Sequence, residues 1–138
     1  MDRGAYDQYL LMFNQRHYDG VIGHFAEDCE ISFAGYSIRG HQAICDFYAF
    51  FHDYVDDRIT VTRFHGGAET VAIEAIVRLT GRQDLGAELL HAKGLGGLVP
   101  LQQGQVIEIP QFIHYHVQNG KFTRALCAIF TEPVTIIT

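Results

Sequence analysis

Residues 112–130 read FIHYHVQNGKFTRALCAIF and carry the clearest fold signal in the chain. Asn119-Gly120 separates two apolar runs, and Asn-Gly in that position is a strong signal for the turn of a β-hairpin. We therefore expect one strand over residues 106–117 and another over residues 122–130. Pro110 within the first strand predicts a sheet edge or a bulge, which also suits a sheet that bends sharply.

Working back from this hairpin, residues 59–64 alternate between apolar and polar side chains, as a half-buried strand does. Gly66-Gly67 then predicts a turn into a second strand over residues 71–79. The central part of the chain therefore supplies a further antiparallel pair.

The first 55 residues read mainly as helix. Apolar residues recur at helical spacing over residues 6–13, 21–25 and 44–55, with Asp19 as a cap for the second helix and a short strand over residues 30–33. The third helix is expected from His41 to Tyr54, and we expect Asp53, Asp56 and Asp57 to end it, because the helix dipole disfavours acids there. Helices first and strands afterwards indicate an α+β domain.

The 138 residues fit a single domain over 1–138. The formal net charge of -6, with ten scattered basic residues, argues against nucleic-acid binding. No apolar run is long enough for a membrane span, and the first residues do not resemble a signal peptide, so we expect a cytoplasmic protein. Three widely spaced cysteines indicate reduced thiols, and their spacing predicts no metal site.

Residues 81–103 mix seven large apolar side chains with several glycines. A polar linker would not carry so many apolar groups, and one helical turn is expected over residues 87–91. Two interpretations remain open: a lid over a pocket and a dimer contact.

These segments together resemble the SnoaL-like and ketosteroid-isomerase-like branch of the nuclear transport factor two superfamily. The resemblance rests on YLLMFNQRHYDGVIGHFAED (residues 9–28), on Gly40-His41-Gln42-Ala43-Ile44 and on the hairpin quoted above. It implies a cone-shaped α+β barrel, in which a strongly curved, mainly antiparallel mixed sheet wraps around three N-terminal helices and encloses an apolar pocket. It also implies a homodimer through the outer sheet face, no cofactor and no metal.

The resemblance carries the family's chemistry over only in part. Tyr9 matches a tyrosine that serves as an oxyanion donor in ketosteroid isomerases. The two catalytic aspartates of that family fall on Phe33 and Ile113 in this chain. The resemblance therefore implies a more apolar pocket than in catalytic relatives, with Tyr9 as its polar group. The alternative is that Tyr9 is a core tyrosine whose hydroxyl has a backbone partner.

Five further side chains are candidates for acid–base chemistry or for metal binding. Glu74 is the single carboxylate in an apolar strand, and it either faces the cavity as an acid/base or lies on the outer face beside Arg78. His65 and His91 lie in turn and loop segments, where histidine is a common acid–base residue. His114 and His116 share one strand face, but the inward set Ile113, Tyr115 and Val117 leaves both histidines outside, without a metal.

The side chains expected to line the pocket are mostly aromatic: Phe13, Phe33, Tyr48, Phe51, Phe112, Ile113, Tyr115 and Cys127. The sequence thus predicts a protein that binds a small apolar polyketide-, steroid- or terpenoid-like molecule. If it is an enzyme, the expected reaction is cofactor-free proton transfer next to a carbonyl, of the isomerase, cyclase or dehydratase type. The alternative is a non-catalytic ligand-binding or dimerisation module of the same fold.

Overall fold

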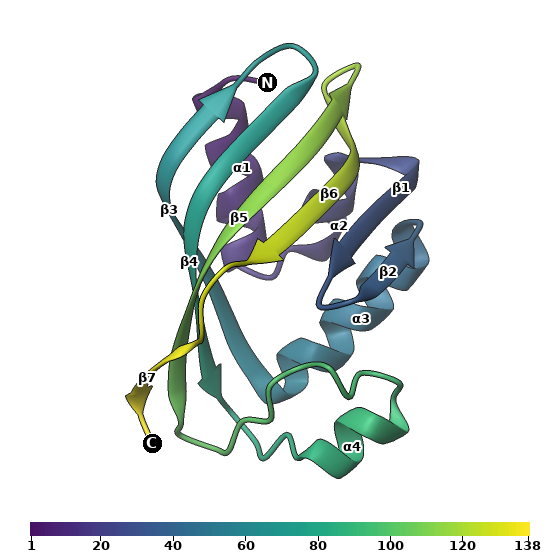
Figure 1. Ribbon diagram of the computed structural model, residues 1–138. Helices are drawn as coiled ribbons and strands as arrows, with labels where there is room; N and C mark the ends of the chain where they lie inside the picture. Colours follow the sequence, from purple (N-terminus) through teal and green to yellow (C-terminus); the bar gives the residue numbers. More distant parts are fainter.

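A computed structural model describes residues 1–138 and shows an α+β domain in which a curved, open sheet packs against the N-terminal helices (Figure 1). The helices are α1 (Arg3–Asn14), α2 (Tyr18–Gly23), α3 (His41–Tyr54) and α4 (Ala87–Ala92). The strands are β1 (Phe25–Phe33), β2 (Tyr36–Arg39), β3 (Val55–Gly66), β4 (Thr70–Gly81), β5 (Val106–Gln118), β6 (Lys121–Ile129) and β7 (Val134–Ile137).

The sheet runs in the order β2-β1-β6-β5-β4-β3, with β7 pairing to β5 beyond the end of β6. Only the β1–β6 pair is parallel, so the sheet is mixed but mainly antiparallel, as expected. The β5–β6 hairpin forms around Asn119 and Gly120, and both residues have positive φ angles. Pro110 lies where the neighbour of β5 changes from β7 to β6, so the ladder on that side loses no hydrogen bond to the proline.

The helices follow the predicted periodicity with one correction. The Asp2 side chain caps α1 by accepting from the Ala5 amide, and the buried face of α1 packs toward the sheet. The predicted cap of the second helix is wrong: His17 is the N-cap residue of α2, and Asp19 lies in the first turn, where a negative charge is favourable. α3 has the bounds predicted for it.

Three segments are more extended than the sequence suggested. β1 begins at Phe25 rather than at Glu30, and β2 had no counterpart in the prediction. The strand β3 starts at Val55, directly after α3, so Asp56 and Asp57 belong to a strand and do not end the helix. The consequence is that the two acids point to opposite faces of the sheet.

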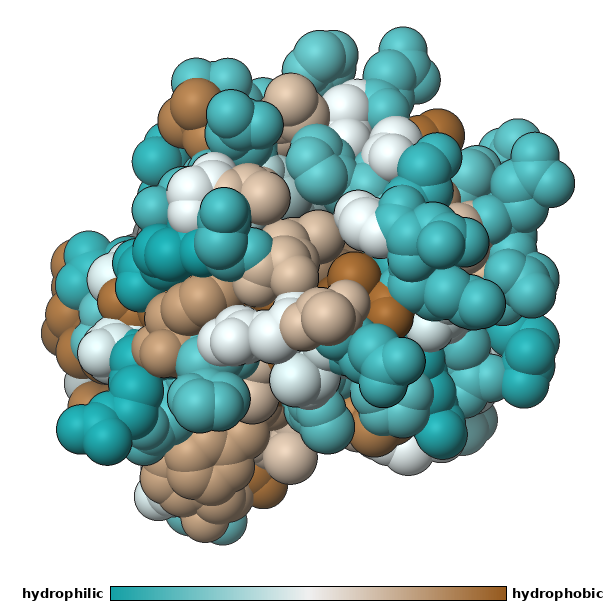
Figure 2. All heavy atoms as spheres, turned by 90° about the horizontal axis from the view of Figure 1, so that it is seen from above, coloured by the Kyte–Doolittle hydropathy of each residue, from teal (hydrophilic) through white to brown (hydrophobic).

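The inner face of the sheet holds the core, and its outer face is partly apolar. Phe112 is 43% exposed on the outer face and stacks on the exposed Phe130 ring at 4.4 Å between centroids. The dimer contact expected on this face stays a prediction. Seen from above, hydrophilic residues cover most of the surface and surround a narrower apolar band (Figure 2). None of the helices has the length and the apolar character that crossing a membrane requires.

Candidate functional site

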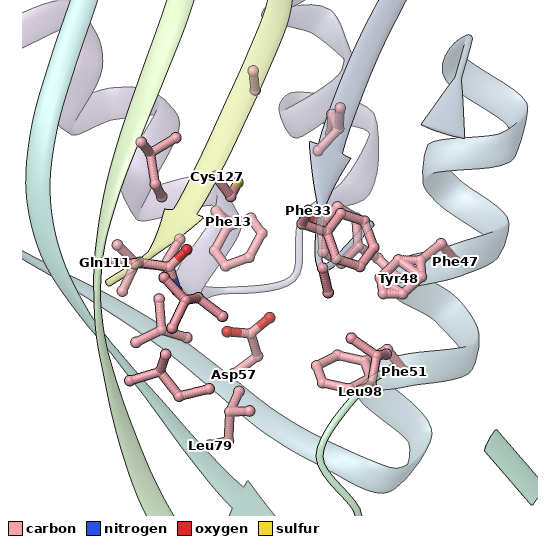
Figure 3. A pocket seen from close by; sticks show the side chains of 18 of the residues that line it. Phe13, Phe33, Phe47, Tyr48, Phe51, Asp57, Leu79, Leu98, Gln111 and Cys127 are labelled. Atoms are coloured by element: carbon pink, nitrogen blue, oxygen red, sulfur yellow. The ribbon is translucent and has the colours of Figure 1, made fainter. Parts of the chain in front are cut away.

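A pocket lies between the inner face of the sheet and the helices (Figure 3). Its volume is about 150 Å³, it is partly open to solvent, and 19 of its 21 lining residues are hydrophobic. Apolar cavities of about this size hold a benzene-sized molecule. The wall consists of Tyr9, Phe13, Phe25, Ile31, Phe33, Ala34, Phe47, Tyr48, Phe51, Asp57, Ile59, Val77, Leu79, Leu98, Ile109, Gln111, Ile113, Tyr115, Ala125, Cys127 and Ile129.

Aromatic rings from three elements form one side of the pocket. On α3, the Phe47 and Phe51 rings stack at 5.5 Å between centroids, and the Phe33 ring of β1 lies 5.0 Å from Phe47. The Phe13 ring of α1 meets Tyr48 edge-on at 5.3 Å. These rings present flat apolar surfaces to the cavity, as ring-shaped apolar ligands require.

Asp57 is the one charged residue on the pocket wall, and its side chain points into the cavity in Figure 3. It is only 6% exposed, and Oδ2 lies 3.2 Å from Nε2 of His52. Its second oxygen, Oδ1, is the only fully buried side-chain polar atom in the structure without a hydrogen-bond partner. Burying an unpartnered polar atom costs stability, so an atom left in this state calls for a functional explanation.

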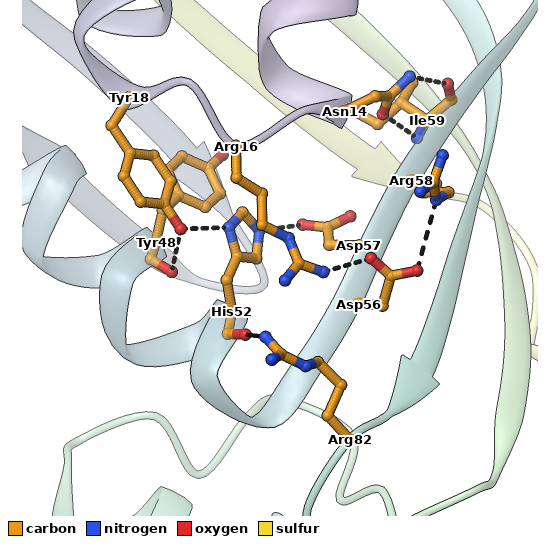
Figure 4. A network of polar contacts seen from close by, with 10 residues as sticks. All are labelled: Asn14, Arg16, Tyr18, Tyr48, His52, Asp56, Asp57, Arg58, Ile59 and Arg82. Atoms are coloured by element: carbon orange, nitrogen blue, oxygen red, sulfur yellow. Dashed lines mark hydrogen bonds and ion pairs between the residues drawn. The ribbon is translucent and has the colours of Figure 1, made fainter.

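His52 lies between Tyr18 and Asp57 (Figure 4), and it does not line the pocket. Its ring is 3% exposed, and Nδ1 lies 2.9 Å from the Tyr18 hydroxyl. The ring also stacks on Tyr48 at 5.2 Å and on Tyr18 at 5.9 Å between centroids. Arg82 donates to the His52 backbone oxygen at 2.6 Å, which ties the end of α3 to the segment after β4. His52 is therefore fixed on both ring nitrogens and on its main chain.

Besides Asp57 and Gln111, the polar groups of the wall are three buried phenols and one thiol. Burial raises the pKa of Tyr9, Tyr48 and Tyr115 well above the usual value, and for Tyr48 the nearby Asp57 charge raises it further. Burial, with a smaller contribution from Asp57, raises the pKa of Cys127 to about 12. These groups stay protonated at neutral pH, so they can donate hydrogen bonds but do not act as bases or nucleophiles.

The structure corrects the acid–base candidates. Tyr9 is 4% exposed and lies on the pocket wall. Glu74 lies on the outer face of β4, where its carboxylate is 3.3 Å from Arg63, because Ile73 and Ala75 occupy the inner face. His65 and His91 are exposed and do not reach the pocket. Glu74, His65 and His91 therefore lie outside this pocket, and for Glu74 the alternative on the outer face is the one that the structure shows.

Seven of the eight side chains predicted to line the pocket do lie on its wall: Phe13, Phe33, Tyr48, Phe51, Ile113, Tyr115 and Cys127. Phe112 does not, because residues of β5 alternate between faces and Ile113 takes the inner one. His114 is exposed on the outer face, and no group of three or more potential metal ligands occurs in the structure. Whether the seven side chains bind a ligand stays a prediction.

Sequence reasoning missed Asp57, His52 and Gln111, although each follows a visible pattern. Asp57 shares the inner face of β3 with Val55 and Ile59, a period of two that becomes visible once the strand starts at Val55. His52 follows Tyr48 by four residues on α3, so both lie on the same helix face. Gln111 lies between Ile109 and Ile113 at a spacing of two on β5, so it shares their inner face.

The segment 81–103 contains α4 at the predicted place and borders the pocket through Leu98. Leu85, Leu90 and Leu101 belong to the core, and the Gly97 amide donates to the Tyr36 hydroxyl at 2.6 Å. This anchoring places the segment at the pocket wall; its role as a lid or as a dimer contact stays a prediction.

Structural comparison finds the same fold in several solved proteins, none of them close in sequence. A protein from Xanthomonas campestris pv. campestris, provisionally assigned as a polyketide cyclase, superimposes with a TM-score of 0.72 at 20% identity over 90% of this chain and 86% of its own. An epoxide hydrolase of M. tuberculosis superimposes with a TM-score of 0.68 at 13% identity, over 91% and 80% of the two chains. A Catenulispora acidiphila protein with a ketosteroid-isomerase-like fold, in complex with trimethylamine, gives 0.67 at 12% identity, over 92% and 85%.

A comparison with curated proteins finds no match. The sequence does match the profile of the SnoaL-like domain over residues 6–125. This span includes the three N-terminal helices and the pocket-forming strands up to Ala125 in β6. The resemblance seen in the sequence is thereby confirmed, and the chain belongs to the SnoaL-like domain family.

Proposed function

We propose that this protein binds a small, largely apolar molecule of the polyketide, steroid or terpenoid type and transfers a proton next to its carbonyl group, with Asp57 as the acid–base residue. The proposed reaction is of the isomerase, cyclase or dehydratase type and needs no cofactor. One observation carries the proposal: Oδ1 of Asp57 is buried and unpartnered at an apolar pocket, while Oδ2 is held by His52.

In the proposed step, a C–H bond beside the ligand carbonyl breaks. The proton moves to Asp57, and the electron pair shifts to the carbonyl oxygen as an enolate. A phenol at the wall stabilises that oxygen by donating a hydrogen bond. Tyr48 and Tyr9 both supply phenols at the same wall as Asp57, and both stay protonated because burial raises their pKa.

The size of the pocket restricts the ligand. A cavity of about 150 Å³ accommodates one ring, so a larger ligand would extend through the rim formed by the exposed Ala34 and Ile129. The comparisons support the choice of chemistry, since relatives on the same fold include proteins assigned as a polyketide cyclase and as an epoxide hydrolase.

The test follows exchange of the α-hydrogens of 2-tetralone, an apolar cyclic ketone, in D2O by NMR. The wild-type protein should accelerate the exchange, and Asp57→Asn should reduce that acceleration by about 10²-fold or more, as expected for loss of a general base. Glu74→Gln is the matched control, because it neutralises a carboxylate on the outer face and should leave exchange unchanged. Equal rates for Asp57→Asn and the wild type would contradict the proposal.

The second candidate is a binding module of the same fold without catalysis. It is favoured by the positions of Phe33 and Ile113, which replace the aspartates expected from catalytic relatives. In that case 2-tetralone or a larger steroid would raise the melting temperature, yet no exchange above the buffer rate would occur.

A further inference from the structure

A line of polar groups leads from the pocket to the surface between α2 and α3 (Figure 4). It starts at Asp57 on the pocket wall, passes through the imidazole of His52 at 3.2 Å, and reaches the Tyr18 hydroxyl at 2.9 Å. His52 is buried, whereas Tyr18 is half-buried and does not line the pocket. The line therefore has one end in the cavity and the other end near solvent.

The hydrogens along this line can be arranged in two ways. In the first, Tyr18 donates to Nδ1 of His52, and Nε2–H donates to Asp57. In the second, Tyr18 donates to the Tyr48 backbone oxygen, 3.5 Å away, Nδ1–H donates to the Tyr18 oxygen, and Nε2 accepts from a protonated Asp57. Both arrangements use the same heavy-atom positions, so a proton can shift along the line without a rearrangement of the fold.

We propose that His52 and Tyr18 carry the proton of Asp57 between the pocket and the solvent. The proposal rests on the proposed function for the step that protonates Asp57. It gives a physical reason for a histidine buried behind the pocket, because the apolar wall has no other charged group that could receive the proton. His52 is then a positioning and relay residue that does not touch the ligand.

A half-turn of the protonated carboxyl group of Asp57 presents its O–H to Nε2 of His52. The proton moves to Nε2, the Nδ1 proton moves to the Tyr18 oxygen, and the Tyr18 proton leaves to water. Asp57 is again a carboxylate, His52 is again neutral, and one proton has left the pocket.

The surroundings of the outer end suit this role. Arg16, Arg82 and Asp53 act on the Tyr18 hydroxyl, and Cys45 lies near it. Asp56, on the opposite face of β3 from Asp57, pairs with Arg16 and Arg58, so it does not compete for His52. Burial raises the pKa of Tyr18, which therefore passes protons as a neutral phenol.

The test needs no ligand: it measures exchange of the His52 ring N–H with water by NMR on protein labelled with ¹⁵N-histidine. Tyr18→Phe keeps the ring that stacks on His52 but removes the hydroxyl, and it should slow exchange about tenfold or more. Tyr54→Phe is the control, because Tyr54 is a half-buried tyrosine two residues from His52 on α3 that takes no part in the line. Asp57→Asn should slow exchange as well, because the Nε2 proton can leave only to Asp57 when Nδ1 takes a proton from Tyr18.

Two results would overturn the relay. One is an exchange rate in Tyr18→Phe equal to that of Tyr54→Phe. The other is slowing by Asp57→Asn instead of by Tyr18→Phe, which would mean that the His52 proton exchanges through the pocket. Replacing tyrosine by 3-fluorotyrosine, which retains the ring and makes the hydroxyl more acidic, gives a second measurement and should speed exchange. If the wild-type protein does not accelerate exchange of 2-tetralone, but Tyr18→Phe still slows exchange of the His52 ring proton, the proposed function is contradicted and the relay stands.

Discussion

The core of this protein has a closed end and an open end, both built from aromatic side chains. At the closed end Tyr6 and Phe122 are fully buried, and the Tyr9 ring meets Phe122 edge-on at 4.9 Å. At the open end Phe33 and Phe47 are only half-buried and border the cavity. Rings of the same kind therefore fill space at one end and leave it free at the other.

The polar groups of the two ends differ in whether they have hydrogen-bond partners. The Tyr6 hydroxyl lies 3.0 Å from the Tyr115 hydroxyl, so these two phenols satisfy each other. Asp57 at the open end has one oxygen held by His52 and the other unpartnered. Hydrogen-bonded polar groups stabilise a unique packing, whereas an unpartnered buried group lowers stability and leaves an atom free to hydrogen-bond a ligand. The closed end accounts for the fold and the open end for the proposed function.

The largest effect we expect concerns the reactivity of Cys127, which lies at the open end but has the pKa of a buried thiol, about 12 instead of 9.0. Iodoacetamide should therefore alkylate it about 10³-fold more slowly at pH 8 in the folded chain than in urea, as peptide mass spectrometry would show. Since the folded pKa lies above the unfolded one, the thiol favours folding below pH 9 and loses this contribution as pH rises through about 12. Alkylation as fast as in urea would mean that water enters the open end freely.

Truncating one ring at each end sharpens the comparison in terms of stability. Phe122→Ala should lower the free energy of unfolding by about 3–5 kcal/mol, because the ring is 0% exposed and leaves a closed void. Phe33→Ala should cost clearly less, since that ring already borders a cavity. Urea unfolding measures both, and equal losses would show that the pocket is packed like the rest of the core.

The next prediction concerns Tyr9, the phenol that the family resemblance singled out. Tyr9→Phe should lower the exchange rate of 2-tetralone about tenfold, the loss expected when one neutral donor to the enolate is removed. Tyr54→Phe, which alters a half-buried tyrosine away from the pocket, serves as the control. A Tyr9→Phe protein with an unchanged rate would leave Tyr48 as the sole donor.

The fold was predictable because its signals are local. Asn119-Gly120 specifies a hairpin by itself, and the stripe on α3 requires only a period of 3.6 over one segment. β2 and β7 were not predictable, because each has four residues and is held by its partner strand rather than by its own pattern.

The site was predictable only where apolar character sufficed. Alternation brings Ile113 and Tyr115 to the pocket, and the same alternation excludes Phe112. Asp57 could not be recognised, because its role depends on Oδ1 having no partner, which is a property of the whole fold. An acid beside a helix end is interpreted as a helix terminator, and its place on the inner strand face becomes visible only when the strand is extended back to Val55.

At the closed end, the Tyr6–Tyr115 pair allows a smaller test. Tyr6→Phe should lower the free energy of unfolding by about 1 kcal/mol, because the Tyr115 hydroxyl loses its partner. Since Tyr6 does not line the pocket, exchange of 2-tetralone should be unaffected. A large loss of exchange in Tyr6→Phe would show that the two ends are coupled through Tyr115, which borders both.

The smallest change in stability is expected where the largest loss of activity is proposed. Asp57→Asn removes a buried charge that has only one partner, and the amide can still hydrogen-bond His52, so the free energy of unfolding should change by less than about 1 kcal/mol. Asp57→Ala should cost more, because Nε2 of His52 would lose its partner in a site that is 3% exposed. Urea unfolding at neutral pH distinguishes these outcomes. A loss of about 3 kcal/mol or more in Asp57→Asn would identify Asp57 and a protonated His52 as a structural ion pair. The open end would then be held together in the same way as the closed end, and the unpartnered oxygen would no longer distinguish the two.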